Sequence, residues 1–410
     1  MGRKALLTYL VILPAIVVAL LFSSGLAFAK KAPGTYGTAN LMVVVERDPA
    51  SILIIDGTDH EVVGRVKLPG AKQPHAPVFS PDGRYYYVMG RNGLYFKVDL
   101  LKQKVVAKQK IGEDSRGSAI TPDGRYVVAG NYKPGTAVIM DARDLKILKV
   151  IKGPKAIAKG KVIRSRAASI TDIGGVKNLM AIAWKEAGEV WVVDMNNPKF
   201  PVIKKFKGAG AMLHDSFVTE DGRYYMLAAQ ASNHMWIMDA YKLEYLGTIS
   251  TRANSDVPGK IPHPGPGACV EDICFTPNVG TGTVTAYRPA TVEFVKNIPT
   301  TGAKNPGGLF IRKHPGAKLV VADAVFHEGK KHSKVYVIDA ETLEVVKKLE
   351  VGPGAVHPEF TAKGVYMYVS SWGGNKIVVF DGKTFKKIKE IPAKTPTSII
   401  NSGRTHENGL

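Results

Sequence analysis

Short apolar runs recur along the chain, and each closes on a turn that is usually led by an aspartate. The segment Ser51–Leu68 reads SILIIDGTDHEVVGRVKL, with apolar residues on both sides of a turn at Asp56. Runs of this length, alternating apolar and polar positions between turn residues, are typical of β-strands joined as hairpins. Seven further segments share the pattern: Leu94–Ile111, Ala137–Ile151, Glu189–Phe206, Met235–Ile249, Thr283–Pro299, Lys334–Val351 and Lys376–Ile391.

The turns recur at the spacing of a propeller blade. Neighbouring turns lie 42 to 53 residues apart, which is the length of one four-stranded blade. A strand pair of the type FSPDGRYYYVMG, at 79–90, precedes each hairpin and brings the unit to four strands. The turns are led by Asp56, Asp99, Asp141, Asp194, Asp239, Arg288, Asp339 and Asp381, so an arginine replaces the aspartate in the sixth copy.

The two ends of the repeat region complement each other. Asn40–Glu46 (NLMVVVE) runs straight into the first hairpin without a preceding strand, and Pro396–Ser402 (PTSIINS) follows the eighth as a spare strand. Shared pairing of these ends would close the ring and leave no open sheet edge. We therefore predict an all-β, eight-bladed β-propeller over residues 40–410. Seven blades plus an irregular segment is the alternative, because the sixth turn lacks its aspartate and Thr251–Pro266 is rich in Gly and Pro.

Polar residues occupy an equivalent position in several repeats. In three of them a basic residue stands six positions before the strand-pair turn: His75 before Pro81, Arg116 before Pro122 and His214 before Glu220. In a propeller, the chain that leaves one outermost strand for the next innermost strand lies at one face, near the axis, so such residues converge. We call this position the axial slot. Aligned across all eight repeats, it holds His75, Arg116, Arg166, His214, His263, Asn305, His357 and Ser398.

The axial slot combines histidines and arginines as a flat, anionic iron tetrapyrrole requires. One imidazole can bind the iron, the other histidines can face the open axial position, and arginines can hold carboxylates. Local sequence spacing alone does not make this a metal motif, because the histidines lie far apart in the chain. The alternatives are histidines satisfied by neighbouring carbonyls and arginines that form salt bridges between blades.

The N-terminus has the features of an export signal. Gly2-Arg3-Lys4 precedes an apolar run from Ala5 to Phe22, and Ala27-Phe28-Ala29 matches a cleavage pattern. We predict a signal peptide or membrane anchor at 1–29 and a linker at 30–39. An export signal implies a periplasmic or extracytoplasmic protein. Because the apolar run is also near the length of a spanning helix, the protein could be either released by cleavage or anchored in the membrane.

Charge and cysteine content narrow the chemistry further. The net charge is +21, which suits an anionic ligand, a membrane surface or a solvated lysine-rich exterior; export makes nucleic acid an unsuitable partner. The two cysteines, Cys269 and Cys274, do not form a Cys-x-x-Cys-His motif, so covalent haem c is not expected. A local disulfide and two free thiols both remain open. No Ser-His-Asp triad, Walker loop or Rossmann fingerprint is evident.

From Leu41 to Leu410 the chain resembles the NirF family of haem d1 biogenesis proteins, and more distantly the d1 haem propeller of cytochrome cd1 nitrite reductase. The segments that carry the resemblance are VVVERDPASILIID near the start, PHAPVFSPDGRYYYVMGRNGLYFKVDLLKQKV around His75, VHPEFTAKGVYMYVSSWGG around His357, and PAKTPTSIINSGRTHENGL at the end. The last of these is similar to NirF and unlike the reductase.

The resemblance assigns roles to residues of the slot. It implies that His75 is the proximal axial ligand of the haem d1 iron, that His214 and His263 stand where the reductase has its two distal, proton-donating histidines, and that Arg116 and Arg166 belong to the d1 pocket. The position of His357 and Asn305 in the same slot adds them as cofactor-binding candidates. Asp215 beside His214 is an arrangement that suits proton delivery.

Three functions compete at this point. The first is an exported protein that binds haem d1 or a late precursor during maturation of the dissimilatory nitrite reductase used in denitrification. This function implies contact with the reductase or with other maturation proteins. The second is a stand-alone oxidoreductase of the d1 nitrite reductase type, with His214 and His263 as catalytic acids and an external electron donor. The third is a propeller that binds only protein partners and no chromophore.

Overall fold

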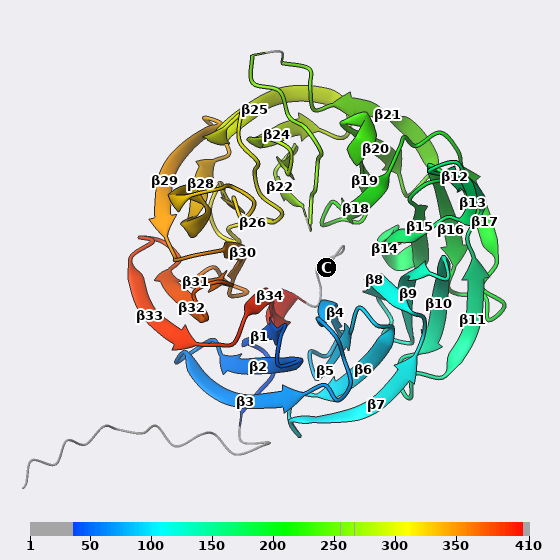
Figure 1. Cartoon of the computed structure of the whole chain (residues 1–410), viewed down its shortest axis with the longest axis horizontal. Helices are drawn as coiled ribbons and strands as arrows, with labels where there is room; N and C mark the ends of the chain where they lie inside the picture. The colour runs from blue at the N-terminus through cyan, green and yellow to red at the C-terminus, as the bar shows by residue number, and fades with distance from the viewer. Residues whose placement is uncertain (1–35, 255, 266, 405–410) are drawn as a thin grey trace, which may run out of the picture.

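The computed structural model describes residues 36–404 except 255 and 266, and it forms a closed ring of eight four-stranded antiparallel sheets (Figure 1). The ring confirms the predicted eight-bladed propeller. The predicted signal peptide or anchor at 1–29 and most of the linker at 30–39 lie outside the described residues. No helix in the described part of the chain is long and apolar enough to cross a membrane.

Each blade runs from an innermost strand at the axis to an outermost strand at the rim. Blade 1 contains β34 (Pro396–Asn401), β1 (Leu41–Glu46), β2 (Ser51–Asp56) and β3 (Glu61–Lys67). Blade 2 contains β4 (His75–Phe79), β5 (Tyr85–Met89), β6 (Leu94–Asp99) and β7 (Lys104–Lys110). Blade 3 contains β8 (Asp114–Ile120), β9 (Tyr126–Lys133), β10 (Thr136–Asp141) and β11 (Ile147–Lys152). Blade 4 contains β14 (Ala167–Ile173), β15 (Leu179–Trp184), β16 (Glu189–Asp194) and β17 (Val202–Phe206).

The second half of the ring repeats this order. Blade 5 contains β18 (Leu213–Val218), β19 (Tyr224–Ala229), β20 (His234–Asp239) and β21 (Glu244–Ser250). Blade 6 contains β22 (Ala268–Val270), β23 (Ile273–Asn278), β24 (Gly282–Arg288) and β25 (Glu293–Gly302). Blade 7 contains β26 (Ile311–Lys313), β27 (Leu319–Asp323), β28 (Lys334–Asp339) and β29 (Glu344–Glu350). Blade 8 contains β30 (Ala355–Phe360), β31 (Tyr366–Ser371), β32 (Lys376–Asp381) and β33 (Lys387–Pro392).

A small hairpin and four short helices lie outside the blades. The hairpin consists of β12 (Lys155–Ala158) and β13 (Lys161–Arg164), inserted between blades 3 and 4. The 3-10 helices are η1 (Gly175–Lys177), η2 (Gln230–Ser232), η3 (Lys330–Ser333) and η4 (Ser402–Arg404).

The ring closes as the sequence predicts, by pairing of its two ends. β34 forms the innermost strand of blade 1 and pairs antiparallel with β1, with Val44 opposite Ile399. The hydroxyl of Ser402 accepts the N–H of Leu41 at 2.8 Å and extends this contact beyond the strands. Both ends of the repeat region, β1 and β34, are thereby held in one sheet, so closure does not depend on a loop.

Side chains of the inner strands fill the spaces between blades. Along β1, Val43 and Val45 pack toward blade 2, whereas Met42 and Val44 pack toward blade 8. Successive side chains of a strand point to opposite faces, and in a propeller both faces of a blade meet a neighbour. All six residues of β1 are therefore buried.

The irregular sixth repeat forms a complete blade, which excludes the seven-bladed alternative. Arg288, which stands in for the turn aspartate, ends β24 and forms ion pairs with Asp272 at 2.6 Å and Glu293 at 3.2 Å. Cys269 on β22 and Cys274 on β23 lie directly opposite each other and form a disulfide, which settles the choice between a bridge and two free thiols.

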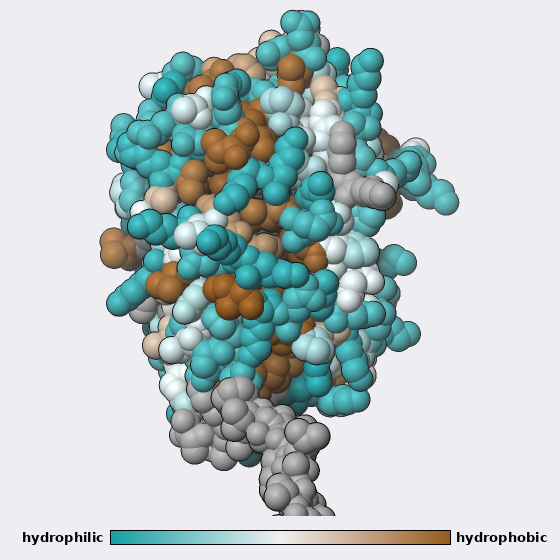
Figure 2. Space-filling model, turned by 90° about the vertical axis from the view of Figure 1, so that its left-hand side faces the viewer, coloured by the Kyte–Doolittle hydropathy of each residue, from teal (hydrophilic) through white to brown (hydrophobic). Residues whose placement is uncertain are grey.

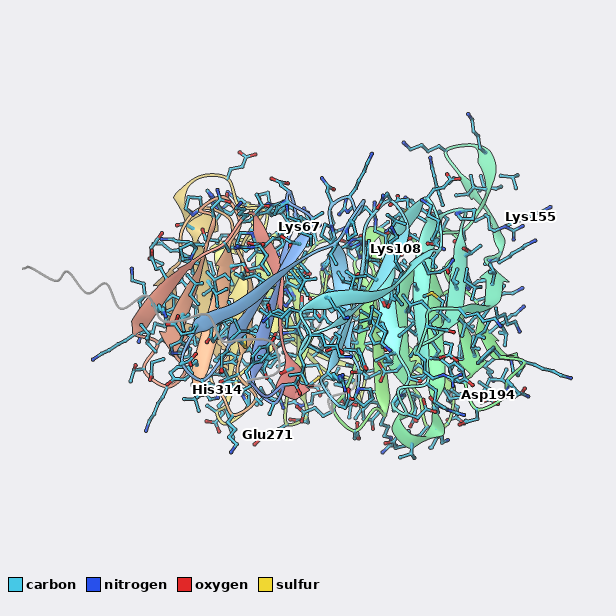
Figure 3. All side chains as sticks on the ribbon, turned by 90° about the horizontal axis from the view of Figure 1, so that it is seen from below. Lys67, Lys108, Lys155, Asp194, Glu271 and His314 are labelled. Carbon is cyan, nitrogen blue, oxygen red and sulfur yellow. A yellow bond between two sulfur atoms is a disulfide. The ribbon has the colours of Figure 1, made fainter. Side chains whose placement is uncertain are left out.

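The two faces of the ring carry different connections. Lys67 at the end of β3 and Lys155 at the start of β12 lie toward one face, whereas Asp194, Glu271 and His314 lie toward the other (Figure 3). The first is the face at which each chain segment passes to the next innermost strand, and we call it the slot face. The outer wall that carries β29 and β33 is mainly hydrophilic, with separate apolar patches (Figure 2).

Candidate functional site

Most residues of the axial slot lie at β-bulges in the innermost strands. In β18, His214 and Asp215 lie between Leu213 and Ser216, which pair with Ala229 and Leu227 on the neighbouring strand. An extra residue of this kind leaves the ladder and turns its side chain away from the regular direction of the strand. The same irregularity recurs in β4 after His75, in β8 at Arg116 and Gly117, in β14 at Ala168 and in β30 at His357.

The backbone before three slot histidines is held in the left-handed region. Such a conformation is uncommon for residues other than glycine and persists only where the surrounding structure fixes it. It occurs two positions before His75, His214 and His263, with φ of 45° at Gln73, 56° at Met212 and 58° at Ile261. One backbone device therefore presents histidines from three different blades.

His75 begins β4 and presents a neutral imidazole with one unused nitrogen. Its Nδ1 lies 3.3 Å from the carbonyl oxygen of Gln73, and because a carbonyl can only accept, Nδ1 carries the proton. Its Nε2 is buried and has no hydrogen-bond partner among the described residues. Burial, together with the charges of Arg91, Arg116 and Arg47, lowers the pKa of His75 to about 3, so the ring is neutral at physiological pH. A buried Nε2 lone pair without a partner is what a haem iron requires of its axial ligand.

Arg47 and Arg91 lie near His75, and part of each guanidinium has no hydrogen-bond partner among the described residues. Arg47 follows β1 and Arg91 follows β5, and the Nε atoms of both are buried without a partner. Within the described ranges, neither guanidinium forms an ion pair. Burial, followed by the charges of Arg91 and Arg116, lowers the pKa of Arg47 to about 10. A buried guanidinium N–H without a hydrogen-bond partner is costly, so this cluster favours an anionic ligand.

A second group of cations gathers around Tyr132, which lies near the end of β9. The guanidinium carbons of Arg116 and Arg166 each lie 4.8 Å from the centre of its ring, and the amine of Lys185 lies 5.9 Å away. Burial raises the pKa of Tyr132 to about 12, so its hydroxyl keeps its proton. Burial, followed by the charge of Arg166, lowers the pKa of Lys185 to about 8.

The two slot arginines also have carboxylate partners of their own. Arg116 pairs with Asp114 at 2.8 Å, and Arg166 pairs with Glu186. Asp114 lies on the same strand as Arg116, and Glu186 belongs to the same blade as Arg166. These pairs therefore do not link blades. They hold the guanidinium groups at the slot face, where each is about a quarter to a third exposed.

His214, Asp215 and His263 form a compact cluster across blades 5 and 6. Asp215 Oδ1 lies 2.9 Å from His214 Nδ1, and Asp215 Oδ2 lies 3.3 Å from His263 Nε2. The two imidazole rings are 4.8 Å apart between centres. Their ligand atoms lie close enough together to hold a metal ion, but they lie equally well for sharing protons through Asp215.

Charge coupling within this cluster sets its protonation. Burial alone would raise the pKa of Asp215, but His263, His214 and Lys185 together lower it well below its usual range. Burial lowers the pKa of His263, and Asp215 opposes that shift. His263 Nδ1 lies 3.2 Å from the carbonyl of Leu309, to which it can donate, and this leaves Nε2 facing the carboxylate.

The structure places His357 and Asn305 in internal contacts. His357 is buried, its Nδ1 accepts the N–H of Ile399 at 3.2 Å, its Nε2 lies 3.3 Å from Arg312, and its ring stacks on Phe310 at 4.3 Å. The side chain of Asn305 donates to the carbonyl of Thr301 at 2.9 Å, within its own turn. Ser398 lies half-buried in β34. These contacts engage His357 and Asn305 within the protein, and their role in binding the cofactor stays a prediction.

Three basic residues next to the axial slot were not predicted from the sequence. Arg47, Arg91 and Lys185 each follow the second strand of a blade, where that strand returns to the slot face. Aligning the ends of the second strands would have found them, because each basic residue follows an apolar run (VVVER, YYVMGR, AIAWK). The cations around His75 and those around Tyr132 also interact electrostatically, since the charge of Arg116 acts to lower the pKa of both His75 and Tyr132.

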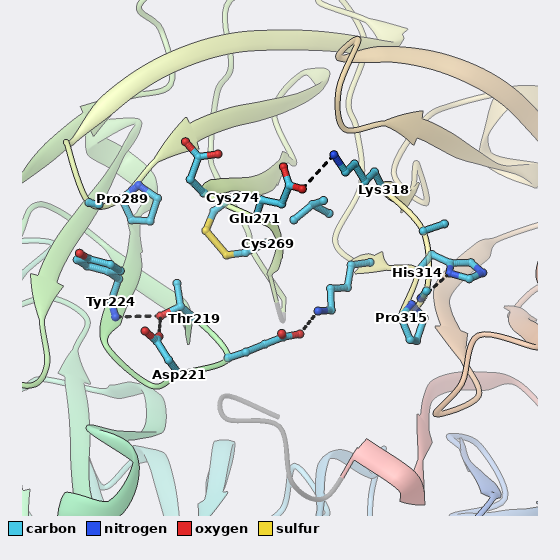
Figure 4. A pocket seen from close by; sticks show the side chains of 17 residues that line it. Thr219, Asp221, Tyr224, Cys269, Glu271, Cys274, Pro289, His314, Pro315 and Lys318 are labelled. Carbon is cyan, nitrogen blue, oxygen red and sulfur yellow. Dashed lines mark hydrogen bonds and ion pairs between the residues drawn. A yellow bond between two sulfur atoms is a disulfide. The ribbon is translucent and has the colours of Figure 1, made fainter.

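A pocket of about 530 Å³ on the opposite face has a different character (Figure 4). It lies beside the Cys269–Cys274 disulfide, and Lys318 crosses it to pair with Glu271 at 3.0 Å. Lys313 pairs there with Glu220 in the same way. These two lysines are thus paired within the protein, whereas Arg47 and Arg91 form no ion pair among the described residues.

Comparison with known proteins identifies the family. Residues 36–405 match the family model described as the cytochrome D1 heme domain. Protein NirF of Stutzerimonas stutzeri is 31% identical over 396 residues, which cover 95% of this chain and 98% of that protein. The dihydro-heme d1 dehydrogenase of Pseudomonas aeruginosa is 32% identical over 372 residues, covering 89% of this chain and 71% of the relative.

A solved structure agrees with the sequence comparison. The dihydro-heme d1 dehydrogenase NirN in complex with DHE superposes with a TM-score of 0.78 at 29% identity, over 92% of this chain and 78% of the other. The fold, the family model and the full-length NirF relatives agree with the resemblance noted in the sequence. The chain belongs to the cytochrome d1 haem domain family and, within it, to the NirF proteins.

Proposed function

We propose that this protein is an exported propeller that binds haem d1 or a late haem d1 precursor and acts in haem d1 maturation for the dissimilatory nitrite reductase of denitrification. Relatives at about 30% identity over almost the whole chain are NirF proteins, and a further relative is named for its action on dihydro-heme d1. The site at the slot face supplies the physical argument.

The observation that carries the proposal is the state of His75. A histidine can ligate iron only when neutral and only through a nitrogen whose lone pair is free. The carbonyl of Gln73 fixes the tautomer, burial and the charges of three arginines lower the pKa and keep the ring neutral, and Nε2 stays buried without a partner among the described residues. When bound, haem d1 would supply an iron centre and a conjugated macrocycle capable of redox chemistry.

The cations around His75 and Tyr132 suit the carboxylates of such a ligand. Arginine can hold a carboxylate through two parallel N–H bonds, which fixes orientation as well as charge. Arg47, Arg91, Arg116, Arg166 and Lys185 all lie at the slot face. We assign these five residues to binding and orienting the anionic edge of the tetrapyrrole.

His214, Asp215 and His263 lie at the same face, and the carboxylate of Asp215 lies within 2.9 Å of one imidazole and 3.3 Å of the other. Asp215 stays ionised because two imidazoles and Lys185 surround it. An ionised carboxylate between two imidazoles can hold a proton on either ring and pass it between them. We assign His214 and His263 to holding or moving a proton at a bound ligand, with Asp215 as the residue that positions them.

Reconstitution tests the proposal. Purified protein titrated with haem d1 should give a shifted visible spectrum that saturates at one equivalent, and His75→Ala should lose or greatly weaken this binding. His314→Ala is the matched control, because His314 also follows an innermost strand but lies at the opposite face. The proposal fails if wild type gives no shift, or if His75→Ala binds as tightly as wild type with the same spectrum.

The proton-holding cluster keeps one enzymatic alternative open, a stand-alone nitrite reductase of the d1 type. His214 and His263 would then act as general acids toward nitrite, and an external donor would supply electrons. Turnover of nitrite by the haem d1-loaded protein with an artificial donor, lost in His214→Ala, would favour the alternative. No turnover with a fully reduced cofactor would remove it and leave storage, transfer or modification of the tetrapyrrole, which analysis of the bound pigment after incubation with a precursor distinguishes.

A further inference from the structure

The hairpin β12–β13 does not belong to any blade. It is inserted where the chain passes from β11, the outermost strand of blade 3, to β14, the innermost strand of blade 4. Lys155, at its start, lies on the side of the ring that also carries Lys67 (Figure 3). The hairpin therefore stands on the slot face, on the same connection that supplies Arg166 to the site.

The hairpin exposes apolar side chains that packing within the protein does not use. Ile157 and Val162 face each other across its two strands and are 75% and 71% exposed. On the adjoining strand β11, Ile147, Leu148 and Val150 are also exposed. Neighbouring exposed aliphatic side chains such as Ile157 and Val162, flanked by charge, are a feature of surfaces that contact another molecule.

The charges that flank these side chains in the sequence have a single sign. Between Leu145 and Thr171 the sequence contains eight basic residues and no acidic one. Lys155, Lys159, Lys161 and Arg164 of the hairpin are all exposed. Such a field attracts a surface of opposite charge and increases the rate at which the two surfaces meet.

The base of the hairpin is connected to the site. The N–H of Ser165 donates to the carbonyl of Pro154 at 2.8 Å and closes the base. The hydroxyl of Ser165 contacts Glu186 at 3.2 Å, and Glu186 is the ion-pair partner of Arg166. A molecule held by the hairpin would therefore lie beside the arginine that we assign to the tetrapyrrole.

We propose that the hairpin Lys155–Arg164 is the docking element for an acidic protein that delivers the tetrapyrrole to this site or receives it from the site. The proposal rests on the proposed function, because it is the ligand that gives the docking its purpose. The partner is identified by its chemistry, a carboxylate-rich rim around an apolar spot that covers Ile157 and Val162. Handover requires such a partner to approach the slot face, where the hairpin stands.

Two observations favour a protein over an anionic lipid surface as the occupant. The segment from Leu145 to Arg166 contains no Trp, Tyr or Phe, the residues that commonly anchor a protein at a membrane interface. The first described residues of the chain also lie at the opposite face, where Tyr36 donates to the carbonyl of Leu100 and Thr38 to that of Asp82. The hairpin thus stands away from the point at which the N-terminal segment joins the propeller.

The test measures transfer separately from binding. Wild type and variants are loaded with haem d1 and mixed with nitrite reductase stripped of its haem d1, and appearance of the holo-reductase is followed by absorbance. The variants are the charge reversal Lys155→Glu/Lys159→Glu/Lys161→Glu and the apolar change Ile157→Ser/Val162→Ser. Matched controls are Lys348→Glu/Lys383→Glu/Lys386→Glu and Val346→Ser, which lie at exposed positions on other blades.

We expect both hairpin variants to bind haem d1 as wild type does but to transfer it at least about tenfold more slowly. We also expect the transfer rate of wild type to fall by a similar factor when the salt concentration is raised from about 50 to about 500 mM. The controls should transfer normally.

Unchanged transfer in both hairpin variants, or no transfer from loaded wild type, overturns the proposal. Loss of co-sedimentation with phosphatidylglycerol vesicles in the variants, with transfer intact, would assign the hairpin to lipid instead. Failure of wild type to bind haem d1 would refute the proposed function, a result visible before any transfer is measured.

Discussion

Asp215 of blade 5 lies 3.3 Å from Nε2 of His263, which belongs to the loop before blade 6. The same carboxylate contacts His214 on its own strand at 2.9 Å, so one acidic group couples two imidazoles that are 49 residues apart in sequence. The contact also joins two blades at the slot face, and it therefore bears on stability as well as on chemistry.

Asp215→Asn should destabilise the protein in a pH-dependent way. The pKa of Asp215 is depressed in the folded state, so its contribution to stability is present above the ordinary aspartate pKa of about 4 and is lost as pH falls below it. The variant should therefore unfold at lower denaturant concentration than wild type near pH 7, and the difference should shrink on acidification. Denaturant titrations at several pH values measure this. Asp272→Asn, at an exposed pair on the opposite face, is the control; a gap between Asp215→Asn and wild type that persists unchanged in acid would contradict the argument.

Lys185 should give ligand binding an alkaline limit. Burial lowers its pKa to about 8, so its positive charge is present below that pH and is lost above it. The affinity for haem d1 should consequently fall by roughly 10- to 100-fold as pH rises past about 8, the scale of one hydrogen bond to a charged group. In Lys185→Met this step should be absent and the affinity should be low at all pH values. A step of the same size in the variant would show that another group is responsible.

Removal of Arg47 should weaken binding of the anionic macrocycle in particular. Its Nε is buried without a hydrogen-bond partner in the described part of the chain, so a ligand carboxylate could accept a hydrogen bond from a guanidinium that is already removed from water. Arg47→Gln should reduce the affinity for haem d1 by roughly 10- to 100-fold, the range for a hydrogen bond to a charged group. The affinity for the methyl ester of the same tetrapyrrole should change much less. Arg143→Gln, at an arginine that is 89% exposed and paired with Asp141, should leave both affinities unchanged, and equal losses for acid and ester would argue against carboxylate binding.

Closure of the ring should depend on the terminal strand. Ile399 on β34 is fully buried between blades 1 and 8, so Ile399→Ala should lower the free energy of unfolding by about 2–5 kcal/mol. Ile388→Ala, at a side chain 46% exposed on the rim, should change it by less than about 0.5 kcal/mol. Calorimetry or denaturant titration decides; a similar small effect of both changes would mean that β34 adds little to closure.

The sequence predicts the fold because the repeat is visible in it. Turn residues at regular intervals and apolar runs between them specify eight blades, and the missing innermost strand of blade 1 is present as 396–402. The sequence left open whether the irregular sixth copy forms a complete blade. Arg288 forms ion pairs with Asp272 and Glu293 at that turn, and these contacts come from two different strand ends.

Part of the candidate site could be predicted from the sequence. The six-residue spacing singles out His75, Arg116 and His214, which lie in or directly beside a bulge of the same length in β4, β8 and β18. His357 lies at a shorter bulge, with one unpaired residue, and is turned into the protein interior. Spacing along the chain does not reveal which way a bulged side chain points.

Other site residues were missed because they lie on different strands. Arg47 and Arg91 follow second strands, and only folding brings them beside His75. In the sequence, Tyr132 looks like any other aromatic residue of a strand. Its contacts are with Arg116 on β8 and with Arg166 directly before β14, which belong to two different blades. Such contacts depend on how three blades meet, which no local pattern encodes.

The most direct test of the central claim replaces the His75 side chain with free imidazole. His75→Gly should bind haem d1 weakly and without the spectrum of a histidine-ligated iron, and added imidazole should restore both the spectrum and the retention of the pigment, because Nε2 of His75 is the proposed ligand atom. His214→Gly should keep the pigment without imidazole. If His75→Gly alone gives the wild-type spectrum, or if His214→Gly is the variant that imidazole rescues, the assignment of His75 to the iron is wrong.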